Sequence, residues 1–288
     1  MQQRGYNIIV NHYNNVESKE PLLLIIIGEG GTGKSFLINA LRKYLKQKCI
    51  VTATTGKASF NINGITIHSF LKLPKPGLQK DLLPVDYIVI DEYSMLGQTT
   101  MGWIDRRCRQ ATGLQDKLFG GKSVILIGDP AQLPPVGDKP LYHSKPSNSI
   151  AEQGFLAYKM FNNVVILDVN QRIRGSQHDQ TLFKGILSRL RNGELSCNDW
   201  KQLLTRQPTV LSNLNKFIDA TRLYYSNEEV AKYNYDRLMQ LETPIAEICA
   251  RHSGANAKSV SAQEMFGFQI SEAILLQTYI LTNFATGF

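Results

Sequence analysis

With 288 residues, 43% of them hydrophobic, the chain is long enough to bury the core of one large domain or of two ordinary ones. Lys and Arg outnumber Asp and Glu by 32 to 24, a net charge of +8 that suits a polyanionic partner such as nucleic acid, although many soluble proteins without one are mildly basic. The longest apolar run is far shorter than the ~20 residues of a membrane span, no signal-like segment precedes it, and the scattered cysteines argue against a zinc cluster or a disulfide framework. We therefore expect an intracellular protein with no membrane partner.

Short apolar segments predict the strands of a parallel sheet. They are rich in β-branched residues, almost free of charge until their carboxyl ends, and bounded by Gly, Pro or Asp. Such runs are typical of a sheet that helices cover on both faces. The expected strands are Leu22–Gly28, Ile50–Thr55, Tyr87–Asp91, Ser123–Asp129 and Asn163–Val169. An amphipathic segment, Ser35–Lys48, separates the first two strands and predicts a βαβ unit.

A Pro- and Ser-rich segment, 137–149, predicts a loop before the last of these strands. We place a domain boundary near Val164, which gives a first domain over 1–163 and a second over 164–288. In the second domain the sequence predicts a helix at Leu182–Gly193, a strand at Thr221–Ser226 and a last apolar run at Ala273–Leu281.

The segment GEGGTGKS, Gly28–Ser35, joins the first expected strand to the first expected helix and fits the phosphate-binding loop pattern. Its glycines let backbone N–H groups surround phosphate oxygens, and the helix amino terminus adds partial positive charge. Lys34 would reach the β- and γ-phosphates, and Ser35 would ligate Mg²⁺. A chance Gly-rich turn is the alternative, which the flanking elements disfavour. The other expected nucleotide contacts are Gly28, Gly30, Gly31, Thr32 and Gly33.

Two acidic residues follow the strand of VIDEYSM, at the edge where ligands bind in open α/β sheets. Asp91 would hold Mg²⁺, and Glu92 would polarise the attacking water as general base. A solvated acidic turn is the alternative. In GDPAQLPPV, Gln132 follows another strand at the same edge and would report whether the γ-phosphate is present, while Pro134 and Pro135 stiffen the loop. A nucleotide kinase, a rival interpretation, has no use for such a reporter, whereas a motor does.

GEGGTGKS, TATTGKAS with GITIHSF, DEYSML and GDPAQLPPV occur in this order and resemble motifs I, Ia with Ib, II and III of the Pif family of DNA helicases. This family lies in the RecD-like branch of helicase superfamily one and includes the helicase portions of helitron transposons. VILDVNQRIRG is similar to motif IV, whose arginine falls on Arg172, and QQRGYNII is similar to the Q motif, whose glutamine falls on Gln3. The resemblance covers nearly the whole chain.

The resemblance implies an α/β P-loop NTPase with two RecA-like domains and ATP with Mg²⁺ between them. Gln3 would contact the adenine and Arg172 the γ-phosphate, the latter from the second domain. Single-stranded DNA would follow a path lined by Thr54, Gly56, Lys57 and His68. The implied activity is that of a monomeric 5′ to 3′ helicase acting on single-stranded and forked DNA. Family members serve DNA repair, recombination and telomere maintenance, in the nucleus or the mitochondrion.

The family's motifs V and VI, which supply a DNA contact and a second arginine to the γ-phosphate, have no counterpart in these 288 residues. The second RecA-like domain is therefore expected to be incomplete. A missing arginine weakens phosphoryl transfer by about 10³- to 10⁵-fold, so we expect a chain that binds ATP and Mg²⁺, hydrolyses ATP weakly and unwinds DNA poorly. The alternative is a catalytically inactive, nucleotide- or DNA-binding transposon relic.

Overall fold

The computed structural model describes residues 1–15, 20–71, 82–172, 178–207, 210, 220–240, 245–248 and 279–282. The chain divides into two compact units, Met1–Gln202 and Leu203–Phe288. No helix in the described ranges is long and apolar enough to cross a bilayer.

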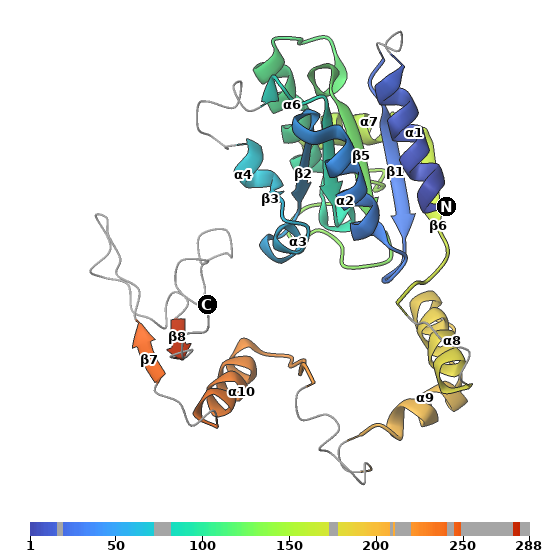
Figure 1. Cartoon of the computed structure of the whole chain (residues 1–288), viewed down its shortest axis with the longest axis vertical. Helices are drawn as coiled ribbons and strands as arrows, with labels where there is room; N and C mark the ends of the chain where they lie inside the picture. Colours follow the sequence, from blue (N-terminus) through green and yellow to red (C-terminus); the bar gives the residue numbers. More distant parts are fainter. Residues whose placement is uncertain are drawn as a thin grey trace. The chain divides into compact units, whose positions relative to one another are not determined.

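A parallel sheet forms the centre of the first unit (Figure 1), with the strand order β3-β2-β4-β5-β1-β6. Its strands are β1 (Leu23–Gly28), β2 (Cys49–Ala53), β3 (Ile65–Thr66), β4 (Tyr87–Asp91), β5 (Ser123–Gly128) and β6 (Asn163–Leu167). Every residue of β4 and β5 is buried, as their continuous apolar sequences predict. The expected strands are confirmed to within two residues at each end, and only the two-residue β3 was not predicted.

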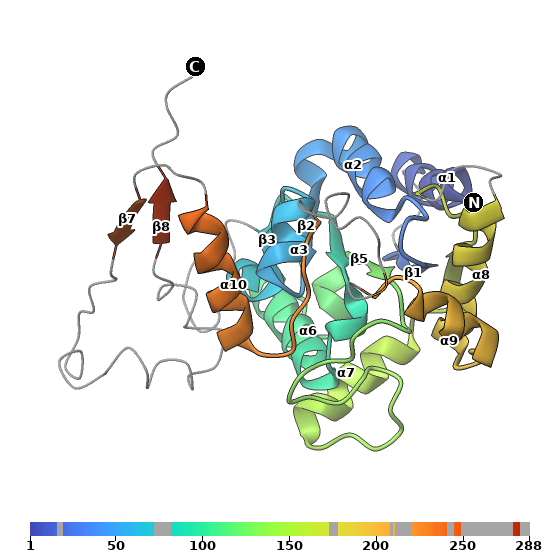
Figure 2. The same cartoon turned by 90° about the horizontal axis from the view of Figure 1, so that it is seen from below.

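Helices cover both faces of this sheet, as expected (Figures 1 and 2). The helices α1 (Gln2–Asn14), α2 (Lys34–Leu45) and α3 (Gly56–Asn61) lie on one face, and α4 (Ile67–Leu71), α6 (Gln98–Thr112) and α7 (Ser149–Lys159) lie on the other. There are also short 3₁₀ turns: η1 (Lys46–Lys48) follows α2, η2 (Tyr93–Met95) follows β4, and η3 (Leu118–Gly121) precedes β5. Each face therefore has its own apolar core, with Leu37 and Leu41 in one and Ile104 and Phe161 in the other.

Strand β6 corrects the domain boundary that the sequence indicated near Val164. Its residues pair with β1, from Asn163 opposite Leu24 to Leu167 opposite Gly28, and a boundary at Val164 would cut through this edge strand. The sequence of an apolar strand does not show whether the strand is the last of one sheet or the first of another. The sequence therefore misplaced the boundary. The first unit continues through α8 (His178–Asn192) and most of α9 (Cys197–Leu204).

The second unit contains α10 (Asn227–Met239) and an antiparallel pair, β7 (Ile245–Ile248) with β8 (Tyr279–Thr282). The prediction of a strand at Thr221–Ser226 is wrong, because these residues lead into α10 and end in its capping box, in which Ser226 and Glu229 bond each other's backbone. Of the predicted apolar run Ala273–Leu281, residues 273–278 lie outside the described ranges and the rest is in β8.

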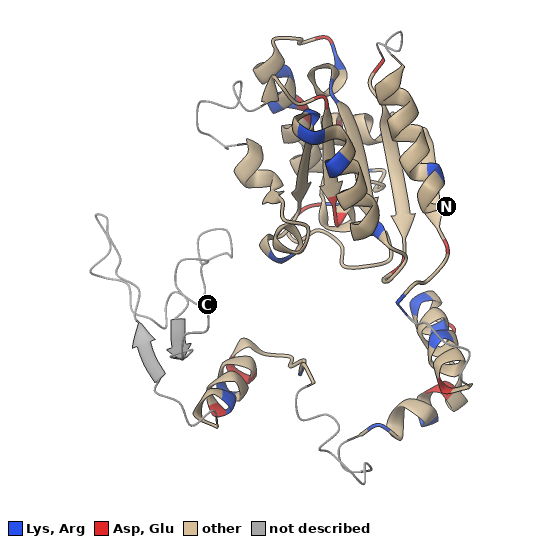
Figure 3. Cartoon of the chain, viewed as in Figure 1, with Lys and Arg blue, Asp and Glu red and all other residues tan. Residues whose placement is uncertain are grey.

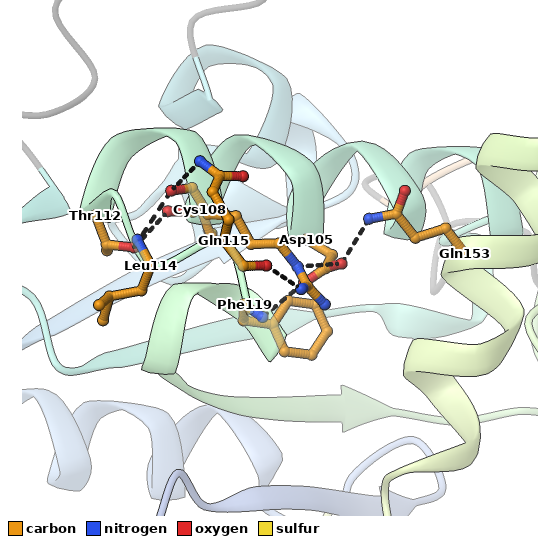
Figure 4. A network of polar contacts seen from close by, with 8 residues as sticks. Asp105, Cys108, Thr112, Leu114, Gln115, Phe119 and Gln153 are labelled. Atoms are coloured by element: carbon orange, nitrogen blue, oxygen red, sulfur yellow. Dashed lines mark hydrogen bonds and ion pairs between the residues drawn. The ribbon is translucent and has the colours of Figure 1, made fainter. Parts of the chain in front are cut away.

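A buried carboxylate on α6 connects this helix to α7 and to η3, on the face of the sheet that α6 covers (Figure 4). Asp105 on α6 is 0% exposed. It accepts hydrogen bonds from the Phe119 backbone N–H (2.6 Å), from Arg109 Nε (2.9 Å) and from Gln153 Nε2 on α7 (2.7 Å). Because Phe119 lies in η3, shortly before β5, these bonds anchor to α6 the backbone that leads into β5.

We expect Asp105→Ala to lower the free energy of unfolding by about 2 to 4 kcal/mol, since it leaves a buried N–H and a guanidinium without their acceptor. Urea unfolding followed by circular dichroism measures the loss. Asp116→Ala, which removes an exposed carboxylate from the neighbouring turn, is the matched control and should change stability by less than about 0.5 kcal/mol. Equal midpoints for the two variants would contradict the role given to Asp105.

Candidate active site at the carboxyl edge of the sheet

The strand order brings three predicted motifs to one edge of the sheet. In the row β4-β5-β1, each strand is parallel to its neighbour. The residues that follow them are therefore adjacent: Asp91 and Glu92 at the end of β4, the loop with Gln132 after β5, and GEGGTGKS after β1. Ligands bind at this edge in open parallel sheets.

The loop after β1 has the geometry of a phosphate-binding loop. Gly31 and Gly33 both have φ +88°, a conformation that L side chains rarely adopt. The buried Lys34 donates from Nζ to the carbonyls of Gly28 (2.7 Å) and Glu29 (3.1 Å), which holds its ammonium over the loop. Because α2 begins at Lys34, the free N–H groups of its first turn also lie at this loop.

Asp91 and Glu92 differ in their surroundings. Asp91 is 5% exposed, and burial raises the pKa of its carboxyl to about 6; the charge of Glu92 adds to the rise, while the Glu92 N–H and Lys34 oppose it. Glu92 has φ +53°, a left-handed backbone that is strained for this residue type. The Thr54 hydroxyl donates to the Glu92 carbonyl (3.1 Å) and so braces this turn.

The loop after β5 lies directly against the turn that carries Glu92. A Cβ atom on Gly128 would lie 3.0 Å from the Tyr93 backbone nitrogen, so only glycine permits this approach. Asp129 is 1% exposed; its carboxylate accepts from the Ala131 N–H (3.1 Å), and its carbonyl accepts from the Gln132 N–H (3.0 Å). The exposed Gln132 side chain thus projects from a turn whose position Asp129 determines.

The segment after β6 lies on the phosphate-binding loop. Asn170 Nδ2 donates to the Gly30 carbonyl (2.9 Å), and the Gln171 N–H donates to the Gly31 carbonyl (2.7 Å). A Cβ on Gly31 would lie 2.7 Å from Cβ of Arg172. Arg172 therefore belongs to the first unit, which corrects the expectation that it approaches from a second domain. The physical reason is the pairing of β6 with β1, which brings the carboxyl ends of both strands together.

A pocket of about 370 Å³ adjoins the loop on its α1 side. Gln3, Tyr6, Phe36 and Leu167 are among its lining residues. Gln3 itself bonds Asn7 Oδ1 (2.8 Å), whereas its neighbour Gln2 donates to the Thr32 carbonyl of the loop (2.7 Å).

Sequence reasoning missed the contact of Gln2 and the place of Phe36 in this pocket. Phe36 is 72% exposed although apolar, and an aromatic residue directly after the loop motif was the available signal. No sequence signal identified Gln2 in preference to Gln3.

The four candidate DNA contacts lie beyond β4, around the carboxyl end of β2. Thr54 follows β2, Gly56 and Lys57 form the first turn of α3, and His68 lies exposed on α4. The Lys57 ammonium lies 5.9 Å from the ring centre of Phe60, which is 76% exposed. The structure thus brings the four residues to one end of the sheet, next to the Glu92 turn through the Thr54 hydroxyl.

The model of the PIF1-like helicase family matches residues 1–201. Among curated relatives, the ATP-dependent DNA helicase PIF1 of Trypanosoma brucei brucei is 38% identical over 128 residues, which are 42% of this chain and 14% of that protein. The human ATP-dependent DNA helicase PIF1 is 29% identical over 257 residues, 83% of this chain and 38% of that protein. The present chain therefore spans well under half the length of either relative.

Solved structures share the fold. The Pif1 helicase from Candida albicans superposes with a TM-score of 0.66 at 23% identity, over 88% of this chain and 57% of that one. The Pif1 helicase from Bacteroides in complex with ADP-AlF3 and single-stranded DNA gives a TM-score of 0.63 at 22% identity, over 91% of this chain and 62% of that one. The RecA-like sheet with helices on both faces is thereby confirmed.

In metal-free buffer at pH 7.5, we expect Asp91→Asn to stabilise the folded chain by on the order of 2 kcal/mol. The folded-state pKa of about 6 lies above the ordinary value, so the wild-type chain loses stability as pH rises from ~4 through 6. An amide does not ionise, and the advantage of the variant should therefore be smaller at pH 5.

Urea unfolding at both pH values measures the difference. Asp86→Asn, at the other end of β4 where the carboxylate is 46% exposed, is the control and should show no such gain. An Asp91→Asn chain that is less stable than wild type at pH 7.5 would contradict the prediction.

Proposed function

Because this chain belongs to the PIF1-like helicase family, we propose that its site binds ATP with Mg²⁺ and couples hydrolysis to movement along single-stranded DNA. The convergence of GEGGTGKS, Asp91, Glu92 and the Gln132 loop on one sheet edge carries this proposal. A nucleotide kinase would explain the first two motifs but gives the Gln132 loop no role.

Each residue of the phosphate site has a role in the proposed reaction. Lys34, already held over its loop, would move from the Gly28 and Glu29 carbonyls to the β- and γ-phosphate oxygens. Glu92 would orient the attacking water and accept its proton. Arg172 lies next to Gly31 of the phosphate-binding loop, and its side chain would reach the γ-phosphate.

The ligand set fits Mg²⁺. The Ser35 hydroxyl and the Asp91 carboxylate offer hard oxygen ligands, and a carboxyl whose pKa burial has raised is one that a divalent cation would ionise. Bound there, Mg²⁺ would neutralise charge on the β- and γ-phosphates.

The α1-side pocket would hold the base of the nucleotide. Gln3 offers an amide that can pair with the adenine edge, and Phe36 offers a ring against which the base can pack. Gln2, through the Thr32 carbonyl, would instead keep the loop in its phosphate-binding shape.

Thr54, Gly56, Lys57 and His68 would line the track for single-stranded DNA. Hydroxyl, backbone and ammonium groups contact phosphates without reading bases, as a translocase requires. The bond from Thr54 to the Glu92 carbonyl offers a direct route between track and site. By family resemblance, movement would run 5′ to 3′ on single-stranded or forked DNA, by a monomer serving repair, recombination or telomere maintenance in the nucleus or the mitochondrion.

For these 288 residues alone, we propose ATP binding with weak hydrolysis. The first unit holds every residue assigned to the phosphate site, including Arg172. The patterns of motifs V and VI are absent from the sequence, and with them a second arginine for phosphoryl-transfer charge. Residues 164–172, which the sequence places in a partial second RecA-like domain, lie in the first compact unit, where β6 pairs with β1.

ATP hydrolysis by the purified chain, with and without single-stranded DNA, tests this function. DNA should raise a low basal rate, and Lys34→Ala should abolish the stimulated rate because it removes the phosphate contact. ATP and DNA binding without stimulated turnover would favour an inactive nucleotide- and DNA-binding relic. Phosphate transfer to a small acceptor would favour a kinase.

Base selection separates the two glutamines. We expect Gln3→Ala to reduce the preference for ATP over GTP by roughly fivefold, the effect of one lost hydrogen bond. Gln2→Ala should lower the affinity for both nucleotides alike, since the Gln2 side chain contacts the loop. Competition against a fluorescent nucleotide measures both affinities, and the opposite pattern would assign base recognition to Gln2.

A further inference from the structure

One cation from outside the predicted motifs reaches the nucleotide site. Arg191, near the end of α8, places Nη1 2.5 Å from Asp129 Oδ2 and Nε 3.4 Å from Glu29 Oε1. Glu29 belongs to the phosphate-binding loop, and Asp129 begins the loop with Gln132. Arg191 thus links the loops that follow β1 and β5, which are neighbouring strands.

Of the two carboxylates that Arg191 contacts, that of Asp129 is the buried one. The Asp129 side chain is 2% exposed, whereas that of Glu29 is 52% exposed, so the Asp129 carboxylate depends on its hydrogen bonds for compensation. The Ala131 N–H and Arg191 supply them, and the hydrogen bond to Asp129 raises the pKa of Arg191. Moving Arg191 therefore disturbs the turn on which Gln132 lies.

Arg191 also belongs to a stiffened helix pair. Two residues earlier on α8, Arg189 binds both oxygens of Asp199 on α9 (2.8 and 2.6 Å), and Asp199 accepts from the Ser196 N–H (3.0 Å). Figure 3 shows Lys and Arg residues on α8, and acidic residues among those at the carboxyl edge of the sheet. Arg189 thus contacts α9, whereas Arg191 contacts the loops of the site.

We propose that Arg191 is a positioning residue of the nucleotide site: it neutralises Glu29 and Asp129 beside the triphosphate and keeps the two loops in register. The inference rests on the proposed ATP function. Without Arg191, two uncompensated carboxylates would border a site that must accept a polyanion. The added γ-phosphate of ATP makes ATP more sensitive to this change than ADP.

The test is the affinity of the full chain for a non-hydrolysable ATP analogue and for ADP, each with Mg²⁺. Arg191→Met should lower the affinity for the analogue by about tenfold or more and the affinity for ADP by a smaller factor. Arg191→Lys, a point charge without the planar fork, should fall between Arg191→Met and wild type. Restoring neutrality with Glu29→Gln and Asp129→Asn in the Arg191→Met background should recover most of the lost affinity.

Arg189→Met is the matched control, because it removes an ion pair from the same helix without touching either loop. It should leave both affinities within about twofold of wild type, and circular dichroism confirms that each variant is folded. An unchanged ratio of the two affinities in Arg191→Met would overturn the proposal. So would an equal loss of affinity in Arg189→Met, or no recovery of affinity in the neutralised triple variant. Failure of the wild-type chain to bind the ATP analogue would instead reject the proposed function.

Discussion

The adjacency of β4, β5, β1 and β6 is the constraint on which the site depends. The phosphate-binding loop, the acidic turn, the Gln132 loop and the Arg172 segment each follow one of these strands. Their spacing therefore follows the spacing of strands in a parallel sheet. Glycine completes this arrangement where strands alone leave too little room, at Gly128 against Tyr93 and at Gly31 against Arg172.

Charge is the second determinant of the site. Four carboxylates lie at this edge, on Glu29, Asp91, Glu92 and Asp129, and the described contacts set Lys34 and Arg191 against them. Burial is the main cause of the raised pKa of Asp91, and the charge of Glu92 adds to it. A bound cation would complete the compensation.

Sequence patterns predicted the parts of the site that local chemistry dictates. A loop of glycines needs a particular backbone, and continuous apolar runs need a two-sided core, so GEGGTGKS and the strands could be read directly. The placement of β6 could not, because strand pairing is a choice among equivalent apolar edges. Gln2, Phe36 and Arg191 were missed for a related reason: each acts through tertiary contacts that no fixed spacing encodes.

Glu92 carries a consequence for how such a chain would change over generations. Its left-handed backbone brings the Cβ atom close to a backbone carbonyl oxygen and would suit glycine or asparagine better, by roughly 1 kcal/mol or more. In a chain without a catalytic requirement, mutation toward those residues would be favoured by stability alone. A glutamate at this position is thus a small, continuing thermodynamic cost, and use of its carboxylate is what would offset that cost.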